Sequence, residues 1–555
     1  MSPYPTTGFG FHSIGKFLKQ GDDKSLLPHF QQAENTSNIF ILRRYRWFLV
    51  GVFVCFFMCF VRWNTNSEDE INNNTVIITS DHKIGNKIES MQTHSTLVVS
   101  EQGIRLEPEV KQVPMVKEDP KHTFTGILLH FKRRNGIKKI LSMMIKYPFI
   151  SQVIVWNNNP DVSITHQNLI EDYLSDGEKS KTLEKYKEMV FIHNHNENIK
   201  DKAKYLACEL ANTTACFYCD DDWDITRYAN ALLADFYNEP SVMHSVTEPY
   251  TYYTNLVWSF YDSNINLHTA FAWIGCGSMF LKSLAVNHLQ KVDKFLESNP
   301  KLKNLVPLSD IFFSIWQNNA PSQIVANIAE ISVEKENVAF SSQGGFLQLQ
   351  HESSMMAIKI LHDELTYNSF FTIFPKKEIE NPFPLFLKSP SSKDSFLFYS
   401  DLFPFLLKNV SFDITNHVHA KRSTRDNLPQ GADVDFFYNN NPTRAVDSDP
   451  SSCWQSNRNV GMDSFFGVDL YSVVTDIAIE IIYSHTKDFH ATLKTRHSID
   501  RKNWVDTSAA SYESNNFSRH SFKDSVRYIE FFTQTGSRNK FGICDFKVFK
   551  NGTSI

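Results

Sequence analysis

Three consecutive aspartates, Asp220-Asp221-Asp222, directly follow a short apolar run at residues 215–219. Carboxylate oxygens are the ligands that Mg²⁺ and Mn²⁺ prefer, and a divalent cation neutralises the diphosphate that departs when a nucleotide-sugar reacts. The Asp-x-Asp spacing lets one carboxylate reach the metal while another reaches the ribose or a bridging water. We therefore expect these acids to bind a cation and a nucleotide-sugar. The alternative is a solvated turn, because aspartate is a favoured turn residue.

Segments of strand and helix period lead up to these acids and predict the elements that hold them. In chain order they cover residues 124–130 (strand), 137–145 (helix), 152–156 (strand), 200–210 (helix) and 215–219 (strand, the third of the series). Pro148 ends the first helix, and Asn157-Asn158-Asn159-Pro160 stops the second strand. Because a strand–helix–strand unit crosses over in the right-handed sense, its two strands are parallel. The acids would then lie at the edge where α/β sheets bind ligands, which predicts a nucleotide-binding fold.

The region from residue 124 to residue 222 resembles the exostosin-like glycosyltransferases, glycosyltransferase family 64. The matching stretches are, in order, FTGILLHFKRR, IVWNN, NIKDK and CFYCDDD. Downstream, residues 273–280 resemble the family's glycine-containing turn beside the acceptor, and Ser309-Asp310-Ile311 resembles its D-D-I motif. The segment from Gly344 to His351 resembles its closing G-x-x-H motif. The resemblance covers residues 121–365, which we expect to form one catalytic domain.

The resemblance implies a GT-A fold with a Rossmann-like nucleotide-sugar sheet, and a cofactor that is Mn²⁺, with Mg²⁺ as the alternative. It also implies transfer of a sugar from a UDP-sugar to a glycan or glycoconjugate, with retention of anomeric configuration. UDP-N-acetylhexosamines are the family's commonest donors, so they are the expected donors here. Retention could use a covalent intermediate on a carboxylate such as Asp310, or same-face attack. An inverting mechanism is a further alternative.

Carried over position by position, the resemblance gives each site residue a role. Asp310, as the acid beside the reacting carbon, and Asp221, near the sugar, would be catalytic. Asp222 would ligate the metal together with Asp220. The residues expected to bind the nucleotide-sugar are Arg133, Asn157, Asn198, Lys202, Asp220 and His351. Lys204 is the alternative to Lys202, because the alignment shifts at this helix, and His351 is the residue expected at the metal or the diphosphate.

Each of these roles has a structural alternative. Arg133 belongs to a basic group that could be a solvated loop, and Asn157 could simply end its strand. Asp310 precedes a helix that it could cap, and His351 could be a structural histidine. Two adjacent positions depart from the family pattern, because Leu308-Ser309 stand where the family has a disulfide cysteine and a second acid.

Short strand-like segments follow a predicted connector at residues 366–405. They cover residues 465–470, 477–482, 527–532 and 546–549. Their period-2 alternation between turn signals indicates an all-β sandwich over residues 406–555. The landmarks around Asp447, Cys453-Trp454 and Cys544 resemble the discoidin, or factor V/VIII type C, domain. That resemblance implies binding of glycans or membrane surfaces through loops at one end. It also implies a closing disulfide, for which Cys544 is well placed and Cys453 is not an obvious partner.

Residues 47–63 are expected to form a single N-terminal transmembrane helix, because residues 47–61 are uncharged and apolar between Arg46 and Arg62. The basic residues before this span would leave residues 1–46 in the cytosol and residues 64–120 as a lumenal stem. The chain would then be a single-pass type II protein of the Golgi or ER membrane. A buried core helix or a distant signal peptide is the alternative. An oxidising lumen would permit disulfides, but the sequence does not determine which cysteines pair.

The formal net charge is −5 and no long basic tract is present, which argues against nucleic acid as the main partner. The leading prediction is a metal-dependent, membrane-anchored glycosyltransferase. The alternative is a catalytically inactive, membrane-anchored carbohydrate-binding protein, in which both lumenal domains recognise carbohydrate. The intact aspartates favour the enzyme, whereas Leu308-Ser309 favour the binding protein. An oligomer is left open.

Overall fold

The computed structural model describes residues 124–170, 186–257, 259–262, 264–300, 309–331, 346–367, 386–403, 434–456, 459–484, 493–507, 512–534, 540–550 and 552–554. The predicted cytosolic tail, membrane anchor and stem lie outside these residues. Among the helices in the described ranges, none combines the length and the apolar character that crossing a bilayer requires.

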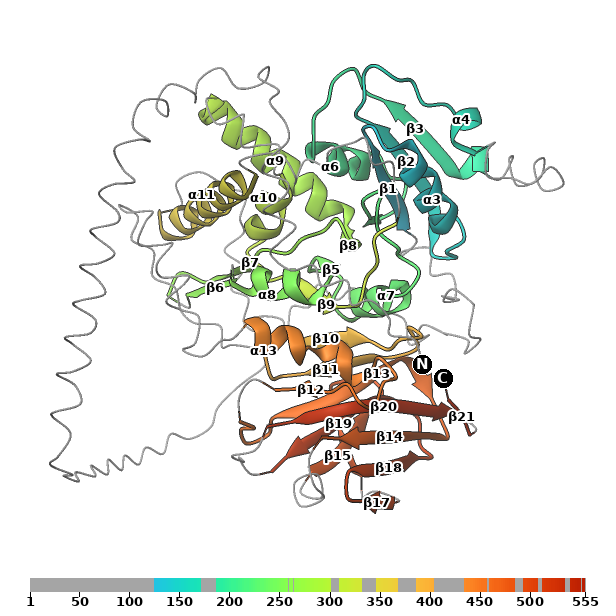
Figure 1. The fold of residues 1–555 in the computed structure, drawn as a ribbon. Coiled ribbons are helices and arrows are strands. Elements are labelled where there is room, and N and C mark those ends of the chain that lie inside the picture. The colour runs from blue at the N-terminus through green and yellow to red at the C-terminus, as the bar shows by residue number, and fades with distance from the viewer. Residues whose placement is uncertain are drawn as a thin grey trace, which may run out of the picture. The chain divides into compact units, whose positions relative to one another are not determined.

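A seven-stranded mixed sheet in the order β3-β2-β1-β4-β8-β5-β9 forms the centre of the α/β part (Figure 1). Its strands are β1 (Phe124–His130), β2 (Ile150–Asn157), β3 (Val190–Asn194), β4 (Ala215–Tyr218), β5 (His244–Thr247), β8 (Ser278–Leu281) and β9 (Ser322–Val325). Strand β1 is parallel to β2 and to β4, which confirms the predicted strand–helix–strand unit, and β8 is antiparallel to β4. The sequence missed β3, so the strand before the aspartates is the fourth and not the third. Strand β3 lies at the sheet edge and is mostly half-buried or exposed, so it lacks the apolar run of a central strand.

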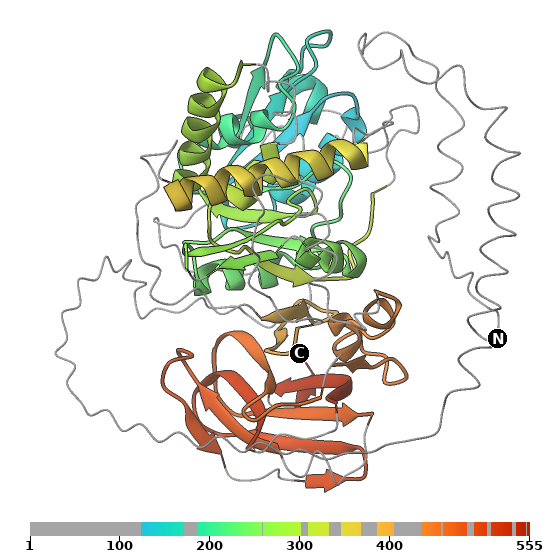
Figure 2. The same cartoon turned by 90° about the vertical axis from the view of Figure 1, so that its left-hand side faces the viewer.

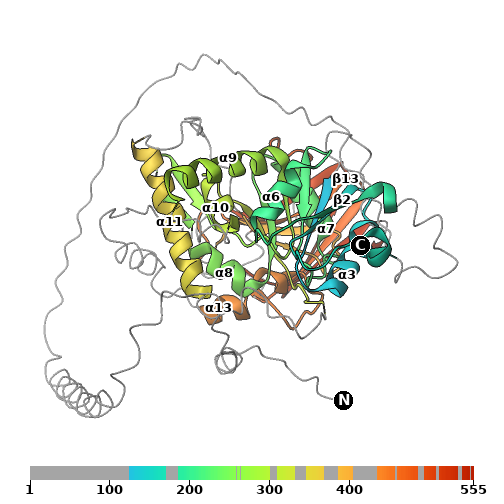
Figure 3. The same cartoon turned by 90° about the horizontal axis from the view of Figure 1, so that it is seen from above.

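Helices cover both faces of this sheet (Figure 3). They are α3 (Arg134–Met144) and α7 (Ala229–Asn238) on one face, and α6 (Lys202–Glu209), α9 (Lys282–Ser298) and α10 (Ser309–Trp316) on the other. The two faces follow from the alternation of side chains along a strand: Phe124 and Leu128 pack with α3 and α7, and Ile127 packs with α6. Helix α11 (Phe346–Tyr367), yellow in Figure 2, packs on α10, where Trp316 Nε1 donates to the carbonyl of Ala357 at 3.1 Å.

Two antiparallel sheets form the C-terminal β-sandwich that the sequence predicted. One has the order β10-β11-β13-β19-β15-β16 and the other β12-β20-β14-β18-β17, with β21 beside β20. The first contains β10 (Leu387–Pro390), β11 (Leu397–Ser400), β13 (Phe465–Val474), β19 (Val526–Thr533), β15 (Leu493–Ser498) and β16 (Val505–Thr507). The second contains β12 (Trp454–Gln455), β20 (Gly542–Lys550), β14 (Ile477–Tyr483), β18 (Phe517–Phe522), β17 (Tyr512–Ser514) and β21 (Thr553–Ser554).

Strands β10 and β11 fall within the segment that the sequence assigned to a connector. They form an antiparallel hairpin, and β11 pairs with β13, so this part of the chain belongs to the sandwich. The sequence obscured them because Pro390 and Lys388 interrupt the apolar alternation that marks a strand.

Two disulfides are present among the described residues, Cys208–Cys216 and Cys453–Cys544. The second corrects the expectation that Cys453 is not an obvious partner of Cys544. Strand β12 pairs with β20 and places Trp454 opposite Ile543, so the preceding cysteine comes to lie beside Cys544. That pairing joins residues 91 positions apart, which local sequence does not reveal.

Candidate active site at the sheet edge

The predicted acidic residues lie at a reversal of strand order in the sheet. From β1 the order continues through β2 to β3 on one side, and through β4 on the other. Ligands of open α/β sheets bind at such a point, outside the carboxyl ends of the two strands that flank it. Arg133 follows β1 and Asp220-Asp221-Asp222 follow β4, so the fold brings them to the same edge.

Arg133 contacts two of the three aspartates directly. Its Nη2 lies 2.5 Å from Asp221 Oδ1, and its Nη1 donates to Asp222 Oδ2. Burial raises the pKa of Asp221 to about 8; the carboxylates of Asp222 and Asp220 add to this rise, whereas the guanidinium of Arg133 opposes it. Burial also raises the pKa of Asp222. Burial thus disfavours the charged forms of Asp221 and Asp222, and the guanidinium of Arg133 partly offsets this effect.

The chemistry of these acids fits a divalent cation. Asp222 Oδ1 is buried and has no hydrogen-bond partner, so an oxygen of the expected metal ligand is left without a counterpart. Carboxylate oxygens are the donors that Mn²⁺ and Mg²⁺ accept. Within the described ranges, however, no group of three or more His, Cys, Asp or Glu side chains is arranged around a common point where a metal could lie. The residues are suitable for a cation, but they do not form a closed cage for one.

A glycine turn lies directly against Asp220. The Asp220 backbone N–H donates to the carbonyl of Gly275 at 2.7 Å, and Tyr218 donates its hydroxyl hydrogen to Asp220 Oδ1. A Cβ at Gly275 would lie 2.0 Å from Asp220 Oδ2, so any other residue there would displace this carboxylate. Gly277 has φ +126°, a backbone conformation that favours glycine, and it packs against the ring of Tyr228. The turn that resembled the family's acceptor turn is thus a neighbour of the acids.

Asp310 lies in a buried charged cluster beside the acids. Its carboxylate accepts hydrogen bonds from Lys204 Nζ at 2.5 Å and from the Tyr205 hydroxyl at 2.9 Å, both in α6. Burial raises the pKa of Asp310, while the ammonium of Lys204 and the hydroxyl of Tyr205 oppose this rise. Lys204 Nζ also lies 3.4 Å from Asp201 and 4.5 Å from the ring centroid of Tyr218. Because Tyr218 also hydrogen-bonds Asp220, one continuous set of contacts links Asp310 to the acidic triplet.

The two lysines that the sequence left as alternatives have different positions. Lys202 Nζ lies 2.6 Å from Asp293 Oδ1 of α9, in a half-exposed ion pair. Lys204 is the one that is buried beside Asp310. The structure therefore places Lys204 in the cluster, while Lys202 faces α9.

The predicted asparagines lie near the same edge. Asn157 is buried, and its amide bridges strand ends: Nδ2 donates to the carbonyl of Val162 at 2.5 Å and to Asn194 Oδ1 at 2.9 Å. Asn198 is half-buried and accepts from the backbone N–H of Lys200 at 3.0 Å. His351 lies in α11, and its side chain is outside the described residues, so its role stays a prediction. Asn157 is engaged in holding the strand ends, which agrees with the structural alternative for this residue.

Sequence reasoning did not single out Tyr205, Tyr218 or Asp201. Tyr218 and Tyr205 lie within apolar runs, so they read as core, and their hydroxyl contacts depend on how α6 packs on the sheet. A weak signal was present in the alternation around β4, which places Tyr218 on the α6 side of the sheet.

The chain matches no protein-family model, and no curated protein matches it. Several solved structures are similar to it over 20% of its length. One is a family 32 carbohydrate-binding module from a family 31 glycoside hydrolase of Clostridium perfringens, 20% identical, with 85% of that structure covered and a TM-score of 0.17. Another is a family 32 module of C. perfringens NanJ in complex with galactose, 18% identical, 83% covered, with a TM-score of 0.17. A third is a chitosan-binding module of Paenibacillus sp. IK-5 in complex with chitotriose, 13% identical, 88% covered, with a TM-score of 0.18.

Proposed function

We propose that the α/β part is an exostosin-like, metal-dependent glycosyltransferase of GT-A fold that moves a sugar from a UDP-sugar to a glycan or glycoconjugate acceptor. UDP-N-acetylhexosamine is the first donor to test, and retention of configuration is the expected outcome. The observation that carries the proposal is the meeting of Arg133 with Asp221 and Asp222 at the reversal of strand order, where α/β sheets bind nucleotides. Lys204 and Asp310 add a buried, oriented carboxylate beside that edge.

The residues of this edge would act mainly by preorganised electrostatics. A divalent cation held by Asp222 and Asp220 would supply positive charge for the departing diphosphate. Arg133 fixes the orientation of Asp221 and Asp222 through its two ion pairs. Lys204 and Tyr205 fix the orientation of the Asp310 carboxylate, which is the group available to stabilise positive charge on the sugar, or to attack it.

The test compares two charge-matched variants from one turn. Asp222→Asn and Asp224→Asn each remove one negative charge, but Asp224 Oδ1 accepts hydrogen bonds from the backbone N–H and the hydroxyl of Thr226 in its own turn. We expect Asp222→Asn to reduce Mn²⁺-dependent UDP release and sugar transfer by about 100-fold or more, the scale of losing one preorganised electrostatic group. Asp224→Asn should stay within about threefold of wild type, since the Asp224 carboxylate holds Thr226 in its own turn. Near-normal transfer by a folded Asp222→Asn protein would refute the assignment.

A second candidate is the inactive carbohydrate-binding protein. It is favoured by the charge pairing, because Arg133 and Lys204 already neutralise carboxylates that would otherwise attract a cation or react. A panel of UDP-sugars with and without Mn²⁺ separates the two candidates. If wild-type protein binds glycans by calorimetry but neither takes up UDP with Mn²⁺ nor releases it from any donor, the binding protein is the function.

We further propose that the chain is a type II protein of the Golgi or ER membrane, with both folded parts in the lumen. The disulfides Cys208–Cys216 and Cys453–Cys544 support this location, because disulfides persist in oxidising compartments. The β-sandwich would bind glycan or a membrane surface, as its resemblance to discoidin domains implies. A glycosidase-sensitive mass shift of the full chain expressed in cells tests the lumenal orientation.

A further inference from the structure

Helix α7 is held along one face by the β-sandwich. Three of its residues on that face, Ala231, Asp235 and Asn238, contact the C-terminal part of the chain. Their spacing of four and three residues places them on one side of an α-helix. The same helix follows Asp220-Asp221-Asp222 in the chain, so a short stretch of backbone joins the residues that contact the sandwich to the candidate active site.

The N-terminus of α7 takes its cap from the sandwich. Tyr228, at the helix's own N-cap position, makes no side-chain cap hydrogen bond. Asp394, in the turn between β10 and β11, accepts instead from the backbone N–H of Asn230 at 2.7 Å and of Ala231 at 2.9 Å. The bond to Asn230 joins residues 164 positions apart. Asp394 is buried and also accepts from the hydroxyl of Tyr471 at 3.1 Å, so its carboxylate is held on both sides.

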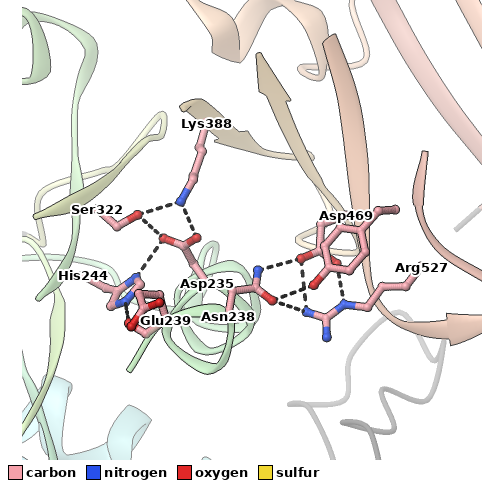
Figure 4. A network of polar contacts seen from close by, with 9 residues as sticks. Asp235, Asn238, Glu239, His244, Ser322, Lys388, Asp469 and Arg527 are labelled. Carbon is pink, nitrogen blue, oxygen red and sulfur yellow. Dashed lines mark hydrogen bonds and ion pairs between the residues drawn. The ribbon is translucent and has the colours of Figure 1, made fainter. Parts of the chain in front are cut away.

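The middle and the C-terminus of α7 have partners in strands β10, β13 and β19 of one sandwich sheet (Figure 4). Lys388 Nζ, in β10, lies 2.5 Å from Asp235 Oδ1. Asn238 donates to Asp469 Oδ2 at 3.0 Å and accepts from Arg527 Nη2 at 2.9 Å. At this end of the helix, the charges of Arg527 and Asp469 compensate each other in an ion pair of 2.9 Å.

Apolar cores also cross this boundary. Leu397 and Tyr471 of the sandwich belong to the core cluster of α3 and α7, and Tyr252 and Val325 of the α/β part belong to the core cluster of the sandwich. Buried apolar contacts of this kind hold parts of a chain in a fixed arrangement, unlike a module on a free linker. Movement of the sandwich therefore moves α7.

The chain between the triplet and α7 is short, and its residues contact other elements close to the acids. Residues 223–228 connect Asp222 to the helix. Within them, Trp223 forms a bridge with Glu330, and Ile225 accepts from the hydroxyl of Tyr147 at 3.1 Å. Tyr228 donates its hydroxyl hydrogen to the carbonyl of Cys276, in the glycine turn that contacts Asp220.

We propose that Asp394 is a positioning residue for the acidic triplet, and hence that the β-sandwich is a structural part of the catalytic site in addition to any glycan that it binds. Through the cap on α7, Asp394 sets where Asp220-Asp221-Asp222 lie. The effect of Asp394 on catalysis rests on the proposed glycosyltransferase function. Its effect on the position of the acids does not depend on that function.

The experiment uses the full chain and compares Asp394→Asn with Asp394→Gly. Asp394 has φ +52°, a conformation that both asparagine and glycine accept, so backbone strain is the same in kind for the two variants. Only asparagine keeps an oxygen that can accept from the helix N–H groups. Lys393→Ala, an exposed neighbour in the same turn, is the control.

The first readout is hydrogen exchange of the backbone amides in residues 219–231, which does not depend on activity. We expect Asp394→Gly to raise exchange there by at least about tenfold, Asp394→Asn to fall between it and wild type, and Lys393→Ala to match wild type. The second readout is the KM for UDP-sugar and the Mn²⁺ affinity, measured well below the unfolding temperature. We expect Asp394→Gly to raise the KM for UDP-sugar by about tenfold and to lower the Mn²⁺ affinity by about tenfold. Asp394→Asn should change each of these values less.

The outcomes distinguish a failure of the positioning role of Asp394 from a failure of the proposed glycosyltransferase function. If folded Asp394→Gly exchanges like wild type in residues 219–231, the positioning role is wrong, whatever the activity. If exchange rises but the KM and Mn²⁺ affinity of an active protein do not change, the triplet does not depend on Asp394 and the proposal also fails. If wild-type protein has no transfer activity, the proposed function fails, and the exchange data alone decide whether the sandwich positions the acids.

Discussion

Several buried basic residues of this protein have polar partners that the structure defines. Arg133 and Lys204 each contact carboxylates, and so does Lys388. Lys291, in α9, donates to the backbone carbonyl of Trp316 at 2.9 Å, and burial lowers its pKa to about 7. Lys291 therefore exchanges its proton near neutrality.

The lowered pKa of Lys291 predicts a pH dependence of stability. The ordinary pKa of lysine is 10.5, so between about pH 7 and 10.5 the unfolded chain binds a proton at Lys291 that the folded chain does not. Because the unfolded state binds more protons in this window, stability from this residue rises with pH, by at most about 1.4 kcal/mol per unit. Lys291→Met should remove that slope in denaturant unfolding between pH 7.5 and 9.5. The exposed Lys187→Met serves as control and should keep it; equal slopes in the two variants would show that Lys291 does not titrate in this window.

At the scale of the elements, the turn from Gly275 to Gly277 brings its backbone close to Asp220, into space that a side chain would otherwise fill. It joins the sheet through β8, and its first glycine leaves space for the carboxylate of Asp220. The end of β4, the glycine turn and the acidic triplet therefore pack closely together. A single methyl group added to the turn would disturb this packing.

Gly275→Ala should disturb the site without unfolding the sheet. The new Cβ would lie 2.0 Å from Asp220 Oδ2 and 2.9 Å from Trp273 Nε1, so the carboxylate must move. We expect Mn²⁺-dependent UDP binding, measured by calorimetry, to weaken by about 10- to 100-fold, the cost of displacing a group by about 1 Å. Gly461→Ala is the control, because it adds the same methyl group at an exposed position whose nearest contact is a serine hydroxyl at 3.3 Å. Unchanged binding in a folded Gly275→Ala protein would mean that Asp220 does not take part.

At the scale of the molecule, the α/β part and the sandwich share buried charge as well as buried apolar surface. Burial alone would raise the pKa of Asp235, but Lys388 and His244 outweigh it and hold this pKa below the usual range. The α/β part thus obtains the cation for one of its buried carboxylates from the sandwich, so we expect the two parts to unfold together.

Lys388→Met tests this coupling. It leaves Asp235 buried without the Lys388 ammonium, and breaking a buried pair in this way costs about 3–5 kcal/mol. We expect one unfolding transition in wild type, followed by both near- and far-ultraviolet circular dichroism, and a single transition at lower denaturant in the variant. Lys494→Met, an exposed lysine of β15, should change stability by less than about 0.5 kcal/mol. Two separate transitions in wild type, or an unchanged midpoint in Lys388→Met, would contradict the shared core.

The sequence by itself determined the local elements and the chemistry of their ends. The sequence predicted strand β1, helix α3, strand β2 and helix α6, because the spacing of apolar residues within each segment indicates its secondary structure. The sequence also predicted the acidic triplet and the parallel sheet edge where it lies. The longer sandwich strands could be predicted as well, because their apolar residues alternate within each segment.

Tertiary structure alone decided which of two lysines faces Asp310, that Cys453 pairs with Cys544, and that Asp394 caps α7. Each of these depends on the rotation or pairing of elements that are distant in the chain. The disulfide spans 91 positions, and the Lys204–Asp310 bond spans 106. The spacing of apolar residues within one segment does not show which distant segment packs against it. That contact forms only when whole layers pack together and exclude water.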